Sequence, residues 1–171
     1  MVAPRVLEKV KHTPAPAKPK CALEAFWRPK TSREADVTKL LRRAELHEPF
    51  RDVVAMGATW DALRATFGGV PTKDGACKVM AMVRREPWLV AQPPEAHVAR
   101  LEELGAIFGG CDEMARRVVG MHPSLLLDRT PRKCVERNLQ ALKSLLPNLC
   151  TNTLVRRCPA LLWRPDWHVR E

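Results

Sequence analysis

Apolar residues recur at helical spacing along most of the chain, beginning near residue 31. Val37, Leu40 and Ala44 follow one another at intervals of three and four residues, as on one face of an amphipathic helix. The segment 31–34 just before them reads Thr-Ser-Arg-Glu, which has the form of a capping box and predicts a helix start. The pattern predicts an all-α fold.

A short motif occurs three times, as Pro-Trp-Leu-Val, Pro-Ser-Leu-Leu and Pro-Ala-Leu-Leu. The three copies begin at Pro87, Pro123 and Pro159, so the prolines are 36 residues apart both times. A valine precedes each proline by four positions, and these are Val83, Val119 and Val155. Repeat lengths of about 20–50 residues are typical of arrays of stacked units.

Each unit is expected to hold a longer helix and then a shorter one. Proline marks the start of two longer helices near residues 94 and 131, and Gly109-Gly110 and Pro147-Asn148 mark their ends. Shorter helices are expected from residue 112 to about 121 and from 151 to about 158, each stopped by the motif proline, with the two apolar residues packed beneath the turn. Pro49 precedes Pro87 by 38 residues and is a candidate degenerate first copy.

These observations predict a solenoid-like array of about three to four helix-pair repeats. The expected organisation is an extended, basic, Pro/Lys-rich tail over residues 1–33, helical repeats over 34–165 and a C-terminal tail over 166–171. One unit cannot bury its apolar face alone, so neighbouring units must stack.

The repeats resemble those of the mitochondrial transcription termination factor (mTERF) family. The likeness rests on Leu-Glu-Glu-Leu-Gly at 101–105, on the segment 135–142 and on Val-Arg-Arg-Cys-Pro-Ala-Leu-Leu at 155–162. It implies a curved all-α array that acts in mitochondria or chloroplasts, in transcription, RNA processing or ribosome assembly and structure. Members that encircle duplex DNA need many more repeats than this chain has. A related helical-repeat family of algal organelles is a rival assignment with the same ribonucleoprotein setting.

Charge is concentrated at the N-terminal end. The formal net charge is +10, and residues 1–43 hold eleven Lys and Arg against four acidic residues. The segment 11–20, Lys-His-Thr-Pro-Ala-Pro-Ala-Lys-Pro-Lys, is too rich in proline for a helix. It is either a flexible linker or a basic arm that orders along phosphates. As a mitochondrial transit peptide the region is ambiguous, since it is basic but Pro-rich and interrupted by Glu8.

Arginine pairs occur in register with the motif prolines, at residues 84–85 and 156–157, and a third pair lies at 116–117. They are either a stripe that binds phosphates or the solvated faces of amphipathic helices. We expect the nucleic-acid contacts to come from basic residues of the tail and the repeats: Lys9, Lys11, Lys18, Lys20, Arg28, Lys30, Arg84, Arg85, Arg116, Arg117, Arg132, Lys133, Arg156 and Arg157.

Other chemistry has little support in the sequence. The six cysteines form no Cys-x-x-Cys pair, so no zinc site is expected, and those at 134, 150 and 158 are expected in the core. Gly-Gly at 68–69 and 109–110 is expected to end helices rather than bind phosphate. Trp60 and Trp88 are expected in or near the core, whereas Trp163 and Trp167 are either an interface anchor or an end cap.

The sequence therefore favours a structural RNA-binding component of an organellar ribosome. The expected site is the mitochondrial matrix rather than the chloroplast, and the expected partners are rRNA and neighbouring ribosomal proteins. The alternatives are an organellar transcription or RNA-processing factor and a protein-binding helical-repeat adaptor. No enzyme activity, cofactor, metal, small-molecule substrate or membrane span is expected, because no acid, base, nucleophile or metal set converges and no apolar run is long enough.

Overall fold

The computed structural model describes residues 21–68, 77–127 and 132–162. All regular structure in these ranges is helical, so the prediction of an all-α fold is confirmed for them. The α-helices are α1 Ala22–Trp27, α2 Glu34–Leu46, α3 Val53–Phe67, α4 Lys78–Arg85, α5 Pro94–Ile107, α6 Asp112–Met121, α7 Arg132–Leu145 and α8 Thr151–Arg157. Short 3-10 helices are η1 Arg28–Lys30, η2 Glu48–Phe50, η3 Pro87–Ala91, η4 Pro123–Leu126 and η5 Pro159–Leu162.

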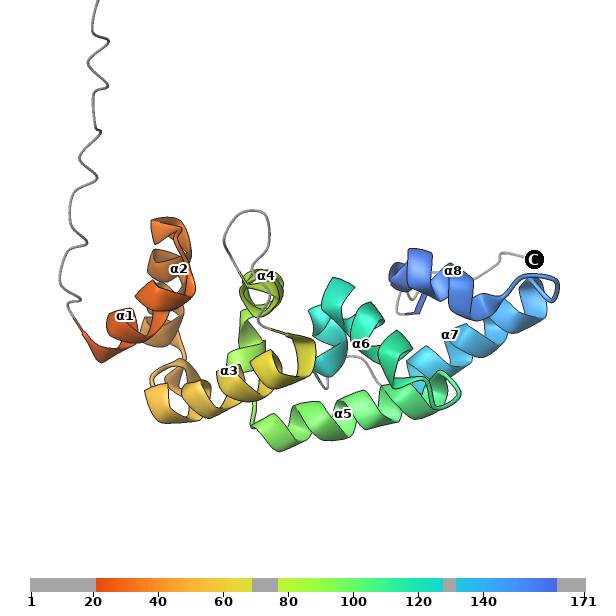
Figure 1. Cartoon of the computed structure of the whole chain (residues 1–171), viewed down its shortest axis with the longest axis horizontal. Coiled ribbons are helices and arrows are strands. Elements are labelled where there is room, and N and C mark those ends of the chain that lie inside the picture. The colour runs from red at the N-terminus through yellow and green to blue at the C-terminus, as the bar shows by residue number, and fades with distance from the viewer. Residues whose placement is uncertain (1–20, 69–76, 128–131, 163–171) are drawn as a thin grey trace, which may run out of the picture.

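The helices form two rows along a curved molecule (Figure 1). The longer helices α3, α5 and α7 follow one edge, and α2, α4, α6 and α8 lie on the other side. Successive members of each row touch: α3 contacts α5 and α5 contacts α7, while α4 contacts α6 and α6 contacts α8. The core lies between the rows, so the second row presents its outer face to solvent.

The three copies of the proline motif occupy equivalent places. Each motif proline follows the shorter helix of its unit, begins a 3-10 helix and is buried. The valines four positions earlier, Val83, Val119 and Val155, have no exposed surface. Pro49 also lies at the start of a 3-10 helix, η2, directly after α2. The predicted ends of the shorter helices are correct, because proline cannot donate to the preceding turn.

Polar side chains of the longer helices donate hydrogen bonds to backbone carbonyls at or beside the 3-10 turns. Thr59 Oγ1 donates to the Gln92 carbonyl at 2.8 Å, and Arg100 Nε donates to the Leu125 carbonyl at 3.0 Å. Asn138 Nδ2 donates to the Leu162 carbonyl at 2.8 Å. All three side chains are buried, and each satisfies a backbone carbonyl at or beside a turn that regular helix bonding leaves open.

Two glycine positions explain how α5 meets α6. A Cβ at Gly105 would lie 2.8 Å from Asp112 Oδ1, so a larger residue there would require the Asp112 side chain to move. Gly109 and Gly110 have φ of 73° and 80°, values that favour glycine. The prediction that this pair ends a helix is confirmed, and Gly68, with φ of 81°, follows α3 in the same way.

The predicted boundary of the N-terminal tail is wrong at its inner end. Residues 22–30 form α1 and η1 rather than an extended chain. Trp27 drives this, because its side chain has no exposed surface and packs edge-on against Trp60 of α3 at 6.0 Å between ring centres. Burial of so large an aromatic ring fixes the short helix against the rest of the fold.

The capping box at 31–34 does not form. Arg33 occupies the N-cap of α2 without a side-chain cap, and Thr31 Oγ1 instead accepts from the Arg33 backbone N–H at 3.2 Å. Thr31 also donates to Asp36 at 3.0 Å. The hydroxyl therefore bonds two residues ahead of itself and to the first turn of the helix, where the sequence predicted a bond three residues ahead.

The placement of the cysteines also corrects the sequence analysis. Cys150 and Cys158 are exposed rather than in the core, and Cys134 is only half-buried. Four cysteines instead occupy helix N-caps: Cys21, Cys77, Cys111 and Cys150 precede α1, α4, α6 and α8. At α1 and α4 the sulfur accepts a backbone N–H of the first turn, from Glu24 and Met80. The thiol acts there as the hydroxyl of a conventional cap does.

The predictions for the tryptophans can be tested in part. Trp60 is buried and Trp88 packs half-buried against Phe50, as expected. Trp163 and Trp167 lie outside the described residues, as do the predicted extended segment up to residue 20 and the C-terminal tail. No helix in the described ranges is long and apolar enough to cross a membrane.

Candidate nucleic-acid interface

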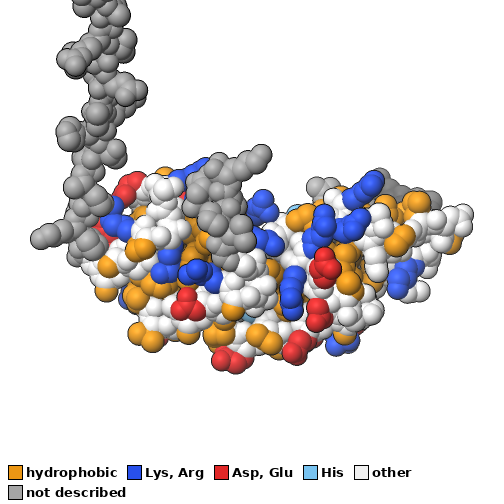
Figure 2. Space-filling model, in the orientation of Figure 1, with side chains coloured by type: hydrophobic (Ala, Val, Ile, Leu, Met, Phe, Trp, Pro, Cys, Tyr) orange, Lys and Arg blue, Asp and Glu red, His pale blue; other side chains and the backbone are white. Residues whose placement is uncertain are grey.

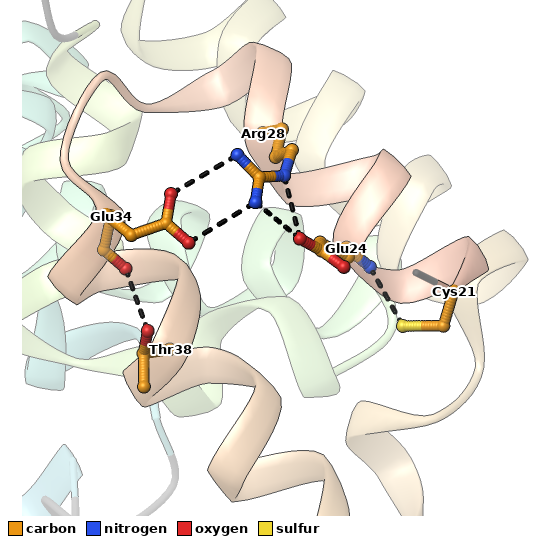
Figure 3. Close-up of polar contacts among 5 residues, drawn as sticks. All are labelled: Cys21, Glu24, Arg28, Glu34 and Thr38. Carbon is orange, nitrogen blue, oxygen red and sulfur yellow. Dashed lines mark hydrogen bonds and ion pairs between the residues drawn. The ribbon is translucent and has the colours of Figure 1, made fainter. Parts of the chain in front are cut away.

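Arg28 is held by acidic residues of its own region. Its Nε and Nη2 donate to Glu24 Oε1, the former at 2.8 Å, and its Nη1 lies 3.2 Å from Glu34 Oε2 (Figure 3). The hydrogen bond that Arg28 donates to Glu24 raises the pKa of Arg28. Two carboxylates neutralise this guanidinium, so it ties α1 to α2 and has little charge left for a phosphate.

Lys30 is packed against aromatic rings. Its Nζ donates to the Phe26 carbonyl at 3.0 Å and lies 3.6 Å from the centre of the Phe26 ring and 5.5 Å from that of Trp60. Burial lowers the pKa of this amine. The contacts are those of a cation on aromatic faces, which stabilises the packing of α1 on α3.

Arg84 and Arg85 point to different neighbours. Arg84 Nε lies 2.6 Å from Asp36 Oδ2, and its Nη2 donates to Thr31 at 3.2 Å, so it joins α4 to α2. Arg85 is exposed and donates from Nη1 to the Met121 carbonyl at 2.8 Å, which joins α4 to the end of α6. This pair connects three successive units, a structural use that its register with the proline did not reveal.

Arg116 and Arg117 of α6 and Arg156 and Arg157 of α8 are all exposed. None of the four has an ion pair or hydrogen bond with another described residue. Figure 2 shows Lys and Arg side chains over α6 and α8, with acidic side chains among them and along the lower edge beside α5. We call these four residues the α6–α8 arginines.

A cavity of about 220 Å³ lies between α6 and α8. Its lining consists of Cys111, Glu113, Met114, Arg117, Asn152, Thr153 and Arg156. Two of the α6–α8 arginines therefore face one space from two different helices. Sequence analysis missed the polar residues at positions 152 and 153, because they belong to no motif and only the contact of α6 with α8 brings them there.

The thiol of Cys150 lies beside this cavity, at the N-cap of α8. Hydrogen bonds from Thr153 lower the pKa of Cys150, with a smaller contribution from the positive charge of Arg156. A backbone hydrogen bond from Asn152 also lowers it, and Thr153, Asn152 and Arg156 all line the cavity. The local field in this part of the molecule therefore favours negative charge.

The basic residues of α7 form no comparable group. Arg132 Nε bonds to Glu136 Oε1 at 2.7 Å, one helical turn away, and this bond raises the pKa of Arg132. Lys133 is exposed beside it. The remaining predicted contacts, Lys9, Lys11, Lys18 and Lys20, lie outside the described residues. Among the predicted residues that the structure describes, only Arg117 of α6 and Arg156 of α8 line one space without an ion pair to a described acidic residue.

Other site chemistry was searched within the same ranges. No group of three or more His, Cys, Asp or Glu side chains in the described part of the chain is placed to hold a metal ion. Buried His97 donates from Nε2 to the Leu89 carbonyl at 2.7 Å, and burial lowers its pKa. Because the carbonyl can only accept, Nε2 carries the proton and the ring is part of the core.

Comparison of the chain with protein-family models, with curated proteins and with solved structures finds no match. The resemblance to mTERF repeats therefore stays a prediction.

Proposed function

We propose that this protein is a structural RNA-binding component of an organellar ribosome, in the mitochondrial matrix, built as an array of stacked helix-pair repeats. The proposed partners are rRNA and neighbouring ribosomal proteins. The observation that carries the proposal is the group of α6–α8 arginines, which are exposed and lack acidic partners among the described residues.

The chemistry of guanidinium groups supports RNA as the partner. Arginine presents planar donors that match phosphate oxygens, and it is less strongly hydrated than lysine. Four such groups on two touching helices would bind a sugar-phosphate backbone without reading its sequence. Recognition by phosphate and shape is the usual way in which proteins bind folded RNA.

The repeating order of elements supports a scaffold. A longer helix, a shorter helix and a 3-10 turn follow one another in α3–α4–η3, α5–α6–η4 and α7–α8–η5. Such stacking displays equivalent side chains along one row, which suits an extended partner. The mTERF resemblance adds the organellar setting.

Sedimentation from an organelle lysate tests the proposal. Tagged full-length protein is run through sucrose gradients at low and high salt, with and without RNase. Co-migration with one ribosomal subunit that survives high salt and collapses after RNase is the expected result. A slowly sedimenting protein that RNase does not affect would refute it and favour a protein-binding adaptor, whereas loss at moderate salt would favour a transient transcription or RNA-processing factor.

A further inference from the structure

The cavity between α6 and α8 has a counterpart between α2 and α4. The counterpart is lined by Asp36, Lys39, Leu40, Met80, Val83, Arg84 and Pro87 and has a volume of about 80 Å³. In both places an acidic residue near the start of one helix, Asp36 or Glu113, is followed about one turn later by a basic residue, Lys39 or Arg117. Both face an arginine that lies three residues before a motif proline, Arg84 or Arg156. The two spaces therefore share the same arrangement of charged residues along the sequence.

The two spaces differ in one bond. Between α2 and α4, Asp36 and Arg84 form an ion pair at 2.6 Å, so acid and arginine occupy each other. Between α6 and α8, Glu113 and Arg156 line the space without an ion pair between them. The second space is larger, and its charged groups have no partner within it.

From this contrast we propose that the α6–α8 cavity binds one unpaired nucleotide of RNA, with its phosphate on Arg117 and Arg156 and its base inside the cavity. This inference rests on the proposed function and specifies the form of RNA that this site takes. The volume of about 220 Å³ is several times the ~30 Å³ share of one water molecule, and it is below the ~300–1,000 Å³ of sites for drug-sized ligands. That is room for one planar base and not for a duplex.

The lining distinguishes a nucleotide from a bare phosphate. Two guanidiniums provide donors for phosphate oxygens. Glu113 can only accept hydrogen bonds, and a phosphodiester has none to donate, so the donor for its carboxylate has to come from a base edge or a ribose 2′-OH. Asn152 offers both a donor and an acceptor, and the nearly buried side chain of Met114 gives an apolar surface for the base.

The Glu113 carboxylate also predicts which nucleobase the cavity prefers. Guanine carries N1–H and N2–H side by side on its Watson–Crick edge, and a carboxylate can accept both. Uracil offers only one N–H on that edge. We therefore expect an unpaired guanine to bind more tightly than an unpaired uracil, and Glu113→Gln to reduce this difference.

Two hairpin RNAs test the inference with the full chain. One is fully paired, and the other is identical except for one bulged guanine. Fluorescence anisotropy measures the dissociation constant of each. The expected result is about tenfold tighter binding of the bulged hairpin, the range of one good base contact. A bulged uracil should bind more weakly than the bulged guanine.

Two variants locate the effect. Asn152 is exposed, so Asn152→Trp fills the cavity from its rim and keeps both arginines. This variant should remove the preference for the bulge. Lys39→Gln changes the corresponding basic residue of the α2–α4 space and should leave the preference for the bulged hairpin intact. Circular dichroism melting checks that both variants fold as the parent does.

The outcomes separate this inference from the proposed function. Equal binding of the two hairpins, with both affinities lowered by Arg117→Gln, would overturn the nucleotide site and leave RNA binding standing. A bulge preference that Asn152→Trp does not reduce would place the unpaired base elsewhere and would also overturn it. Absence of binding to either RNA would overturn both the site and the proposed function.

Discussion

The space between α2 and α4 and the space between α6 and α8 are lined by the same kinds of charged residue at corresponding positions. They differ in whether those residues form an ion pair with each other. In the first, Arg84 is bonded to Asp36 and Thr31, and little space is left. In the second, Arg156 and Arg117 face an open cavity. An arginine three residues before a motif proline can thus form an ion pair that connects two helices, or it can remain available for a partner. The position of one carboxylate in the preceding unit decides which role it takes.

The largest effect on RNA affinity is expected when all four α6–α8 arginines are removed together. The variant with Arg116, Arg117, Arg156 and Arg157 all changed to Gln should lose on the order of a hundredfold in RNA affinity at about 0.1 M salt, because its phosphate contacts no longer release counterions. The slope of log affinity against log salt should fall by about 3, and the melting temperature should hardly change. Fluorescence anisotropy over a salt series measures both.

A charge-matched variant is the control for this experiment. Lys39, Arg42, Arg64 and Lys143 are exposed and lie on α2, α3 and α7. Changing these four to Gln removes the same charge and should lower the affinity by only a few-fold. An equal loss in the two variants would mean that net charge alone, and not the α6–α8 surface, governs binding.

Arg84 should show the opposite behaviour. Arg84→Ala leaves Asp36, which is only 17% exposed, without its ion-pair partner and with the Thr31 hydroxyl as its remaining donor, and should lower the free energy of unfolding by about 1–2 kcal/mol. RNA affinity should stay within about twofold. Urea unfolding of Arg84→Ala, Asp36→Asn and the double variant measures the coupling between the two residues.

Arg156→Ala is the matched change in the other space. Because Arg156 is exposed and has no ion pair with another described residue, we expect Arg156→Ala to alter stability by less than about 0.5 kcal/mol. If Arg84→Ala and Arg156→Ala destabilised the protein equally, the distinction between an arginine that connects two helices and an arginine that is available for a partner would be wrong.

The buried His97 gives stability a pH dependence of known sign. Burial lowers its folded-state pKa below about 6.5, so below that pH the unfolded chain binds a proton that the folded protein does not. Stability should therefore fall as the pH decreases from about 6.5 toward the folded-state pKa. Melting temperatures between pH 5 and 8 measure the slope, and His97→Gln should flatten it.

His122 contributes with the same sign, because burial and the charge of Arg85 lower its pKa. His122→Gln is therefore the necessary companion variant. A pH slope that persists unchanged in His97→Gln and in the variant that lacks both histidines would show that other groups cause it.

The smallest expected effect concerns the thiol beside the cavity. Thr153 lowers the pKa of Cys150, so the thiolate is more populated near pH 7 and should react faster with iodoacetamide. Thr153→Val should slow this reaction a few-fold, and bound RNA should protect the thiol. Mass spectrometry of the alkylated peptides measures it, with exposed Cys158 as the internal reference. Rates at position 150 that neither change affects would argue against this placement of the thiol.

The sequence predicted the local structure well where proline and glycine set the limits. The ends of α4, α6 and α8 follow from prolines, and the end of α5 from two glycines with positive φ. α1 was missed, because six residues are too few for a helical period and its cause, the burial of Trp27 against Trp60, is a tertiary contact.

The candidate site was predicted only in part. The arginine pairs could be found from their spacing, but their roles could not, since Asp36 is 48 residues from Arg84 and no local pattern connects them. The bond between Arg28 and Glu24 was the exception. Their i,i+4 spacing is a recognised helical pair and was visible in the sequence.

Ultraviolet cross-linking of the native particle followed by tryptic peptide mapping tests the central claim most directly. The account predicts RNA cross-links on peptides 101–116 and 144–156, which carry Cys111, Met114, Asn152 and Thr153 of the cavity. Cross-links confined to peptides within residues 22–68, with both cavity peptides unmodified, would contradict it.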